Sequence, residues 1–286
     1  MSIQTSASEP KGGNVIVNGL RLHYLDWGGN GPPIVILHAT GFLGRIYRPI
    51  AEALRSIGHV YSYDQRGHGD SELPTTPIDG WELTTNDLEG FITGMGLSGV
   101  RGFGHSAGAT AIGAVASRRP DLIVRAVLVE PVILDPANLP EGPGDLHERT
   151  LKRRPAFDSV ETMYRSFANK PPYHTWRKDI LRDYCEFGTR PDGHGGRTLK
   201  CPPEIEAQFY RSAPNFDGLG HILRATTPLL VLFGENTDTG GVALVDRLSA
   251  GAPHRRVAVI PGAGHFIPME KPDEVARMAI DFLGGE

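Results

Sequence analysis

The sequence predicts an α/β fold with a doubly wound, mostly parallel sheet. Continuous apolar runs rich in β-branched residues are typical of strands buried on both faces, and they occur at Pro33–His38, Leu122–Val129 and Pro228–Phe233. Stretches with helical spacing separate these runs, and strands that alternate with helices imply parallel crossovers. With 286 residues, 40% hydrophobic and 22% charged, the chain is long enough for one large domain with a sizeable insertion.

The expected elements follow in chain order. Asn18-Gly19 predicts a two-residue hairpin turn between strands Asn14–Val17 and Leu20–Trp27, because this dipeptide favours such turns. The remaining strands are expected at 33–38, 59–63, 99–105, 122–129, 228–233 and 255–260. Helices are expected near 46–56, 81–95, 107–117, 242–249 and 272–283, and Pro272 suits the first turn of the last one.

From about Pro131 to Ala225 the strand pattern breaks. This stretch mixes prolines, charges and aromatic residues, and it contains no buried-strand run. It is too long for a loop in a compact domain, so we expect a mainly helical insertion. The spacing favours helices over Ser159–Ala168, Trp176–Phe187 and Pro203–Ser212.

Composition excludes several classes of function. The formal net charge is −4, which gives no electrostatic case for binding nucleic acid or an anionic membrane. Two cysteines, Cys185 and Cys201, are too few for a disulfide framework, and no metal-ligand spacing is present. Residues 1–13 read as a loose tail without the apolar core of a signal peptide, and no run of 18 apolar residues occurs. We therefore expect a cytoplasmic protein with no membrane span, metal or organic cofactor.

The most informative stretch is Gly104-His105-Ser106-Ala107-Gly108. It fits G-x-S-x-G at a change from strand to helix, where a sharp turn exposes a serine hydroxyl above the sheet. The motif alone is weak, because Ser106 could equally cap the helix that follows. A serine is a poor nucleophile unless a base and an orienting acid lie beside it, so its partners decide between the two interpretations.

Those partners should follow strands, because sites in open α/β sheets lie beyond the carboxyl ends of the strands. Among 11 histidines, His265 lies in a glycine-rich loop directly after the strand 255–260. For the acid, Asp238 and Glu235 both follow the strand 228–233, and Glu130 after the strand 122–129 is a third option. We favour Ser106, Asp238 and His265, whose order along the chain is the one used by α/β-hydrolases.

An oxyanion requires two backbone N–H donors. Ala107 is expected to supply one, because it starts the helix after the serine. Thr40 is the best-placed residue in the loop after Pro33–His38 for the other. His38 and His68 also follow strands, but His38 is expected to shape its loop, and His105 to pack beneath the turn.

Four segments together give the chain a clear resemblance to the α/β-hydrolase fold family. In family order they are His38–Gly41, Asp64–Ser71, Gly104–Gly108, and Pro261–His265 followed by Pro268 and Glu270-Lys271-Pro272. The resemblance implies an eight-stranded, mostly parallel sheet with a helical cap. Residues 14–131 and 227–286 would form the core, and residues 132–226 the cap.

Two positions depart from the family pattern. Ala39 stands where the oxyanion loop usually has glycine, which leaves that loop less free to approach a substrate. Thr237 stands where the acid commonly lies, three residues after the glycine that ends the strand, and Asp238 comes one residue later. The assignment of the acid therefore stays open among Asp238, Glu235 and Glu130.

The resemblance implies a serine esterase or lactonase that acts on a small molecule with an apolar moiety. C–C bond hydrolysis of a ring-cleavage diketone is the alternative on a similar scaffold, and a non-catalytic ligand-binding member of the fold is a different class. Aromatic residues in 132–226 favour the hydrophobic core of the insertion over a pocket lining. Lys152-Arg153-Arg154 favours a solvated face over a carboxylate site.

Overall fold

One mixed sheet organises the molecule. The computed structural model describes residues 9–134, 144–239, 241–250 and 252–285. Within these ranges eight strands form a sheet in the order β1-β2-β4-β3-β5-β6-β10-β11. Their bounds are β1 Lys11–Val17, β2 Leu20–Gly28, β3 Pro33–Leu37, β4 His59–Tyr63, β5 Val100–His105, β6 Ile123–Val129, β10 Leu229–Gly234 and β11 Arg255–Ile260. The six strands from β4 to β11 in this order are parallel, and β2 is antiparallel to both neighbours. The predicted α/β class with a doubly wound, mostly parallel sheet is confirmed.

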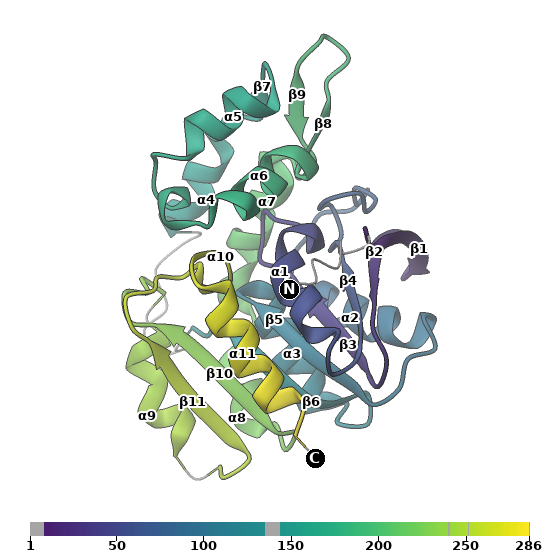
Figure 1. Cartoon of the computed structure of the whole chain (residues 1–286), viewed down its shortest axis with the longest axis vertical. Helices are drawn as coiled ribbons and strands as arrows, with labels where there is room; N and C mark the ends of the chain where they lie inside the picture. Colours follow the sequence, from purple (N-terminus) through teal and green to yellow (C-terminus); the bar gives the residue numbers. More distant parts are fainter. Residues whose placement is uncertain (1–8, 135–143, 240, 251, 286) are drawn as a thin grey trace, which may run out of the picture.

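Helices cover both faces of the sheet, which explains the continuous apolar strands. In β3, Ile34 and Ile36 join one hydrophobic cluster, and Val35 and Leu37 join the other, because successive side chains point to opposite faces. The first face lies under α1 (Arg48–Leu54) and α11 (Pro272–Leu283). The second lies under α2 (Glu82–Gly94), α3 (Ala107–Arg118), α8 (Gly218–Arg224) and α9 (Val245–Ser249) (Figure 1).

The insertion forms a separate layer above the sheet (Figure 1). Its helices are α4 Gly144–Leu151, α5 Val160–Phe167, α6 Lys178–Phe187 and α7 Pro203–Ser212. The three helices predicted in this segment are α5, α6 and α7. A small sheet of β7 (Ala156–Phe157), β9 (Arg197–Leu199) and β8 (Thr189–Pro191) was not predicted, because such short strands leave no periodic pattern. Residues 135–143 of the predicted cap lie outside the described residues, and the division at residues 131 and 227 stays a prediction.

The hairpin at the start of the chain is longer than predicted. Asn18 and Gly19 have φ of 49° and 80°, as a two-residue turn of this kind requires. Lys11, Gly12 and Gly13 were expected in the tail, but they pair with β2 opposite residues 24–26. Backbone pairing with a neighbouring strand thus extends β1 beyond its apolar residues. Residues 1–8 of the predicted tail lie outside the described residues.

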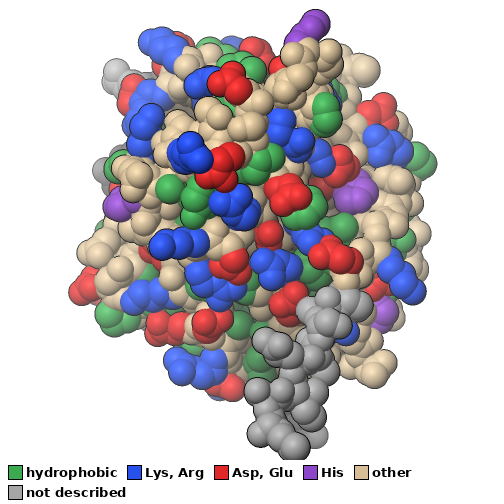
Figure 2. All heavy atoms as spheres, turned by 45° about the horizontal axis from the view of Figure 1, so that its top comes forward, with side chains coloured by type: hydrophobic (Ala, Val, Ile, Leu, Met, Phe, Trp, Pro, Cys, Tyr) green, Lys and Arg blue, Asp and Glu red, His purple; other side chains and the backbone are tan. Residues whose placement is uncertain are grey.

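Charged side chains of both signs are mixed on one face of the molecule. The face in Figure 2 intersperses acidic and basic groups without a large patch of one sign. This pattern agrees with the small net charge of −4. Among the described residues, no helix combines the length and apolar character needed to cross a membrane.

Candidate active site

Ser106 lies on a strained turn between β5 and α3. Its φ is 55° and its ψ is −121°, a combination that residues other than glycine rarely adopt. The glycines on either side make the turn possible. A Cβ on Gly104 would lie 2.5 Å from Ala109 Cα, and one on Gly108 would meet the carbonyl oxygen of Leu37. The turn is therefore tight enough to hold the serine hydroxyl out from the sheet.

His265 is the partner of the Ser106 hydroxyl. Ser106 Oγ lies 3.0 Å from His265 Nε2, which is hydrogen-bonding distance for a nucleophile and its base. Ser106 is the N-cap residue of α3, yet its side chain makes no capping hydrogen bond. The alternative interpretation, in which the Ser106 hydroxyl caps the helix, is therefore wrong. The structure brings together the two residues that the sequence placed at the ends of β5 and β11.

Glu130, rather than Asp238, contacts the other side of His265. His265 Nδ1 lies 3.0 Å from Glu130 Oε2, at the end of β6. Within the described residues Asp238 makes no hydrogen bond to His265, and its exposed side chain lines the neighbouring cavity. The preferred placement of Asp238 against His265 is thus corrected to Glu130, the third option. Glu235, the second option, accepts a hydrogen bond from the Gly262 N–H over 2.9 Å.

The Glu130 carboxylate is completely buried, and both of its oxygens accept hydrogen bonds. Gly234 N donates to Oε1 over 2.6 Å, while the hydroxyls of Thr237 and Thr239 donate to Oε2 over 2.6 and 3.1 Å. Glu130 also has a positive φ of 51°, which bends the chain immediately after β6. A buried carboxylate requires such partners. The loop after β10 therefore supplies donors to an acid that comes from β6.

The two expected oxyanion donors, Thr40 and Ala107, come from different segments of the chain. Ala107 is the first residue of α3, so its N–H has no partner within the helix. Thr40 lines the same cavity as Ser106, and within the described residues no hydrogen bond uses its N–H. The neighbouring Gly41 N–H donates to His68 Nε2 over 2.9 Å, so it is occupied. Thr40 and Ala107 remain the proposed donors.

Two buried histidines hold the loop that contains Thr40. His38 Nε2 accepts from the Gln65 N–H over 2.9 Å, and His68 Nδ1 lies 3.0 Å from the Arg66 carbonyl oxygen. Burial, with His68 beside it, lowers the pKa of His38 to about 3. Burial likewise lowers the pKa of His68 to about 4. Both side chains are therefore neutral at pH 7. Their hydrogen bonds to the Gln65 and Gly41 N–H groups hold the loop in place, as predicted for His38.

His105 links the two sides of the site from beneath the turn. The Ala39 N–H donates to the Tyr47 hydroxyl over 3.1 Å, and this hydroxyl lies 2.7 Å from His105 Nδ1. His105 Nε2 lies 2.9 Å from the His265 carbonyl oxygen. Burial lowers the pKa of His105 well below its ordinary value, so one ring nitrogen can donate while the other accepts. The loop after β3 and the loop that carries His265 are therefore connected by hydrogen bonds.

A cavity of about 840 Å³ opens above Ser106. Core and insertion both line it, and the aromatic side chains among its walls include Phe42, Phe167, Tyr173 and Phe266. Aromatic residues of the insertion therefore form part of the pocket lining, whereas Trp176 and Tyr184 are buried in the hydrophobic core of the insertion. Arg153 lines the cavity as well, so the predicted solvated face is wrong for this residue.

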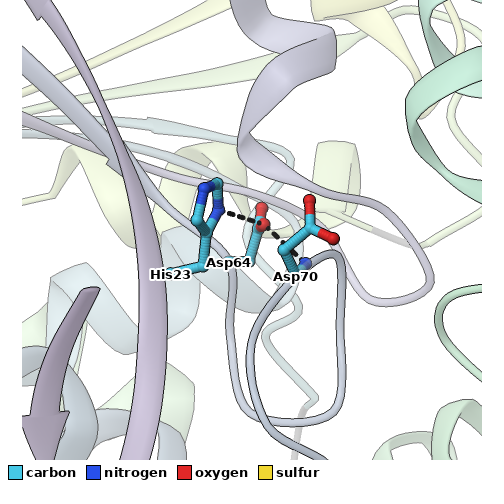
Figure 3. Close-up of side chains that lie close together, drawn as sticks. All are labelled: His23, Asp64 and Asp70. Atoms are coloured by element: carbon cyan, nitrogen blue, oxygen red, sulfur yellow. Dashed lines mark hydrogen bonds and ion pairs between the residues drawn. The ribbon is translucent and has the colours of Figure 1, made fainter. Parts of the chain in front are cut away.

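Outside this cavity, one cluster among the described residues has the composition of a cation site. His23, Asp64 and Asp70 bring three possible ligand atoms within 4.8 Å of one another. Figure 3 shows that His23 and the backbone nitrogen of Asp70 both point at Asp64, while the Asp70 carboxylate points away. His23 Nδ1 lies 3.0 Å from Asp64 Oδ2, and the Asp70 N–H donates to the same oxygen at a distance of 3.0 Å. That carboxylate pairs with Lys200 Nζ at 2.6 Å, and Asp64 Oδ1 accepts from the Gly44 N–H. These hydrogen bonds tie β2 to the loop after β4.

The chain is similar in sequence to curated hydrolases. It is 26% identical to 2-(acetamidomethylene)succinate hydrolase of Mesorhizobium japonicum over 255 residues, which is 89% of both chains. It is 35% identical to N-formylmaleamate deformylase of Pseudomonas putida over 126 residues, which is 44% of this chain and 47% of the relative.

A solved structure and a family model agree with these matches. The crystal structure of E-2-(acetamidomethylene)succinate hydrolase superimposes with a TM-score of 0.85 at 23% identity, covering 96% of this chain and all of the other, which shows a shared fold. A family model described as the alpha/beta hydrolase family matches residues 34–278. The chain therefore belongs to the alpha/beta hydrolase family and is a hydrolase.

Proposed function

We propose that this hydrolase cleaves a carboxylic ester or lactone through an acyl-enzyme formed on Ser106. The observation that carries the proposal is an unbroken line of hydrogen bonds from Ser106 Oγ through His265 to Glu130, with both distances at 3.0 Å. This is the arrangement of nucleophile, base and orienting acid that acyl transfer needs.

In the proposed first step His265 Nε2 takes the Ser106 proton as Oγ bonds to the substrate carbonyl carbon. The carbonyl oxygen becomes an oxyanion held by the N–H groups of Thr40 and Ala107. The imidazolium then returns its proton to the departing alcohol oxygen as the C–O bond breaks. Water, deprotonated by His265, releases the acid, and the Glu130 carboxylate stabilises the imidazolium throughout.

Fluorophosphonate labelling tests the nucleophile without knowledge of the substrate. The wild-type protein should be labelled at Ser106 and should turn over a p-nitrophenyl ester. Ser106→Ala should abolish both while retaining the wild-type melting temperature, because only one hydroxyl is removed. Absence of labelling and turnover in the wild type would indicate a non-catalytic member of the fold, and near wild-type turnover in Ser106→Ala would exclude this nucleophile.

A panel of acyl compounds tests the reaction class. Esters, lactones, amides and ring-cleavage diketones of graded size cover ester hydrolysis and the C–C bond alternative. Amides belong in the panel because the relative aligned over 89% of both chains is named for an acetamido compound. The proposal predicts the highest kcat/KM with an ester or lactone, and a diketone as the best substrate would contradict it.

A further inference from the structure

A largely buried ion pair lies in the wall of the cavity above Ser106. Arg153 Nη1 donates to Glu206 Oε2 over 2.6 Å, and the two side chains are 18% and 7% exposed. Removing both charges from water is costly, so a pair of this kind is weak evidence for stabilisation of the fold. Both residues line the cavity that contains Ser106, so the pair faces the space that a substrate would occupy.

The two members of the pair differ in how fully their hydrogen-bonding groups are used. Arg153 Nη2 also donates to the hydroxyls of Tyr173 and Tyr184, over 3.0 and 2.5 Å. Glu206 Oε2 is occupied by Arg153, whereas within the described residues Oε1 receives one long hydrogen bond, 3.4 Å from the Tyr210 hydroxyl. A carboxylate oxygen has two lone pairs, so Oε1 keeps capacity for a further donor.

Glu206 Oε1 lies beside the oxyanion loop. Gly41 has a φ of 82°, and a Cβ on it would lie 2.5 Å from Glu206 Oε1. The bare α-carbon of Gly41 therefore lets this oxygen approach the loop next to Thr40. Thr40, Ser106 and Glu206 line one continuous cavity, so a bound acyl group would have the acceptor close to its carbonyl.

We infer that Glu206 Oε1 accepts a hydrogen bond from the substrate and selects acyl compounds with a hydroxyl or amide N–H next to the scissile carbonyl. This inference rests on the proposed acyl-transfer function. A carboxylate is an acceptor without a proton to give, so it binds a donor and repels an anion at the same place. Arg153 positions the carboxylate, and its Nη2 donates to the hydroxyls of Tyr173 and Tyr184.

Three p-nitrophenyl esters test the selection: butanoate, 2-hydroxybutanoate and the monoester of succinate. Their kcat/KM values are divided by their rates of uncatalysed hydrolysis to remove intrinsic reactivity. The wild type should prefer 2-hydroxybutanoate over butanoate by roughly tenfold or more, the effect of a hydrogen bond to a charged group. The succinate monoester should be the poorest of the three, and finding it to be the best would overturn the inference.

Substitutions then assign the preference to Glu206. Glu206→Gln should reduce the ratio of 2-hydroxybutanoate to butanoate to near one. Because this change leaves the Arg153 charge without its partner, the double variant Arg153→Met with Glu206→Gln should give the same loss of preference with both charges removed. An unchanged ratio in either variant, with the melting temperature of the wild type, would overturn the inference.

Tyr210→Phe is the matched control, since it removes the 3.4 Å bond to Oε1 and leaves the carboxylate. It should keep or increase the preference for 2-hydroxybutanoate, and loss of the preference would assign it to Tyr210 instead. Failure of this inference is distinguishable from failure of the proposed function. Labelling of Ser106 and turnover of butanoate by the wild type test the acyl-enzyme, whereas the ratio between esters tests Glu206.

Discussion

The ends of β6 and β10 lie side by side in the sheet and make opposite contributions to the site. The end of β6 provides the Glu130 carboxylate to His265. Donors to that carboxylate come from Gly234, the last residue of β10, and from Thr237 and Thr239 in the loop after it. The proposed acid could come from one strand end and its hydrogen-bond donors from the other, or the reverse, because both strand ends reach His265. What matters is a buried carboxylate with satisfied oxygens beside the base.

Burial separates the two acids at these strand ends. Glu130 is 0% exposed and its oxygens accept hydrogen bonds from three residues besides His265. Asp238 is exposed at the cavity. An exposed carboxylate is screened by water, so it stabilises an imidazolium far less than a buried one does.

Glu130→Gln should have the largest effect on catalysis. The amide keeps the shape of the side chain but removes the negative charge and can present an N–H to His265 Nδ1. We expect kcat for a p-nitrophenyl ester to fall by about 10⁴-fold, as when the acid of a triad is replaced by its amide. Glu235→Gln, which changes an exposed carboxylate on the β10 loop, is the matched control. Equal losses in the two variants would contradict the assignment.

Low pH should destabilise the folded protein through His38 and His68, the two buried histidines that hold the loop of Thr40. Their folded pKa values of about 3 and about 4 lie below the unfolded value near 6.5. The unfolded chain therefore binds more protons, and stability is lost as the pH falls below about 6.5. From pH 7 to pH 5 we expect the free energy of unfolding to fall by on the order of 2 kcal/mol for each histidine.

Urea unfolding at several pH values measures this loss. His68→Gln removes one titrating group but keeps an acceptor for the Gly41 N–H, so its stability should depend less steeply on pH. His194→Gln, at an exposed position, should keep the wild-type slope. Identical slopes in all three proteins would contradict the neutral state of His68.

Thr237→Val tests the support that the β10 loop gives to Glu130. It removes the hydroxyl that donates to Glu130 Oε2 over 2.6 Å. A hydrogen bond to a charged group contributes about 1.5–3 kcal/mol, so kcat should fall by roughly tenfold. Thr84→Val is the control, because within the described residues the buried Thr84 hydroxyl has no partner. A wild-type kcat in Thr237→Val would show that Glu130 does not depend on this donor.

Tyr47→Phe should have the smallest effect on kcat. It interrupts the connection from Ala39 through His105 to His265, which positions the oxyanion loop relative to the base. We expect kcat to fall by about threefold, the value of one neutral hydrogen bond, while KM changes little. Tyr63→Phe removes a buried hydroxyl with no partner among the described residues, so it should match the wild type. A change confined to KM would argue against a positioning role.

Local patterns explain what could be predicted from the sequence. The strands with continuous apolar runs, the turn around Ser106 and the loop of His265 each depend on a few adjacent residues, and the structure places them as expected. Helices α5, α6 and α7 were also predicted, because their apolar residues recur at helical spacing.

The assignment of the proposed acid required information that adjacent residues do not carry. Glu130 follows an apolar run directly and resembles the last residue of a strand, while Asp238 lies in the loop where an acid is commonly found. The structure distinguishes them through contacts across more than 100 positions of the chain, such as that between Thr237 and Glu130. Thr237, at the expected position of the acid, was the available signal, because a hydroxyl there can donate to a carboxylate from elsewhere. The Arg153–Glu206 pair depends on similar long-range packing.

The rate constant of Ser106 labelling by a fluorophosphonate tests the role of Glu130 most directly, because it needs no knowledge of the substrate. Wild type, Asp238→Asn and Glu130→Gln would be compared at pH 7.5, with melting temperatures measured in parallel. The structure predicts that Asp238→Asn is labelled within about twofold of the wild type, whereas Glu130→Gln is slowed at least about a hundredfold, the lower range for loss of general-base catalysis. Slowing of Asp238→Asn with wild-type labelling of Glu130→Gln would contradict the assignment of Glu130 as the acid.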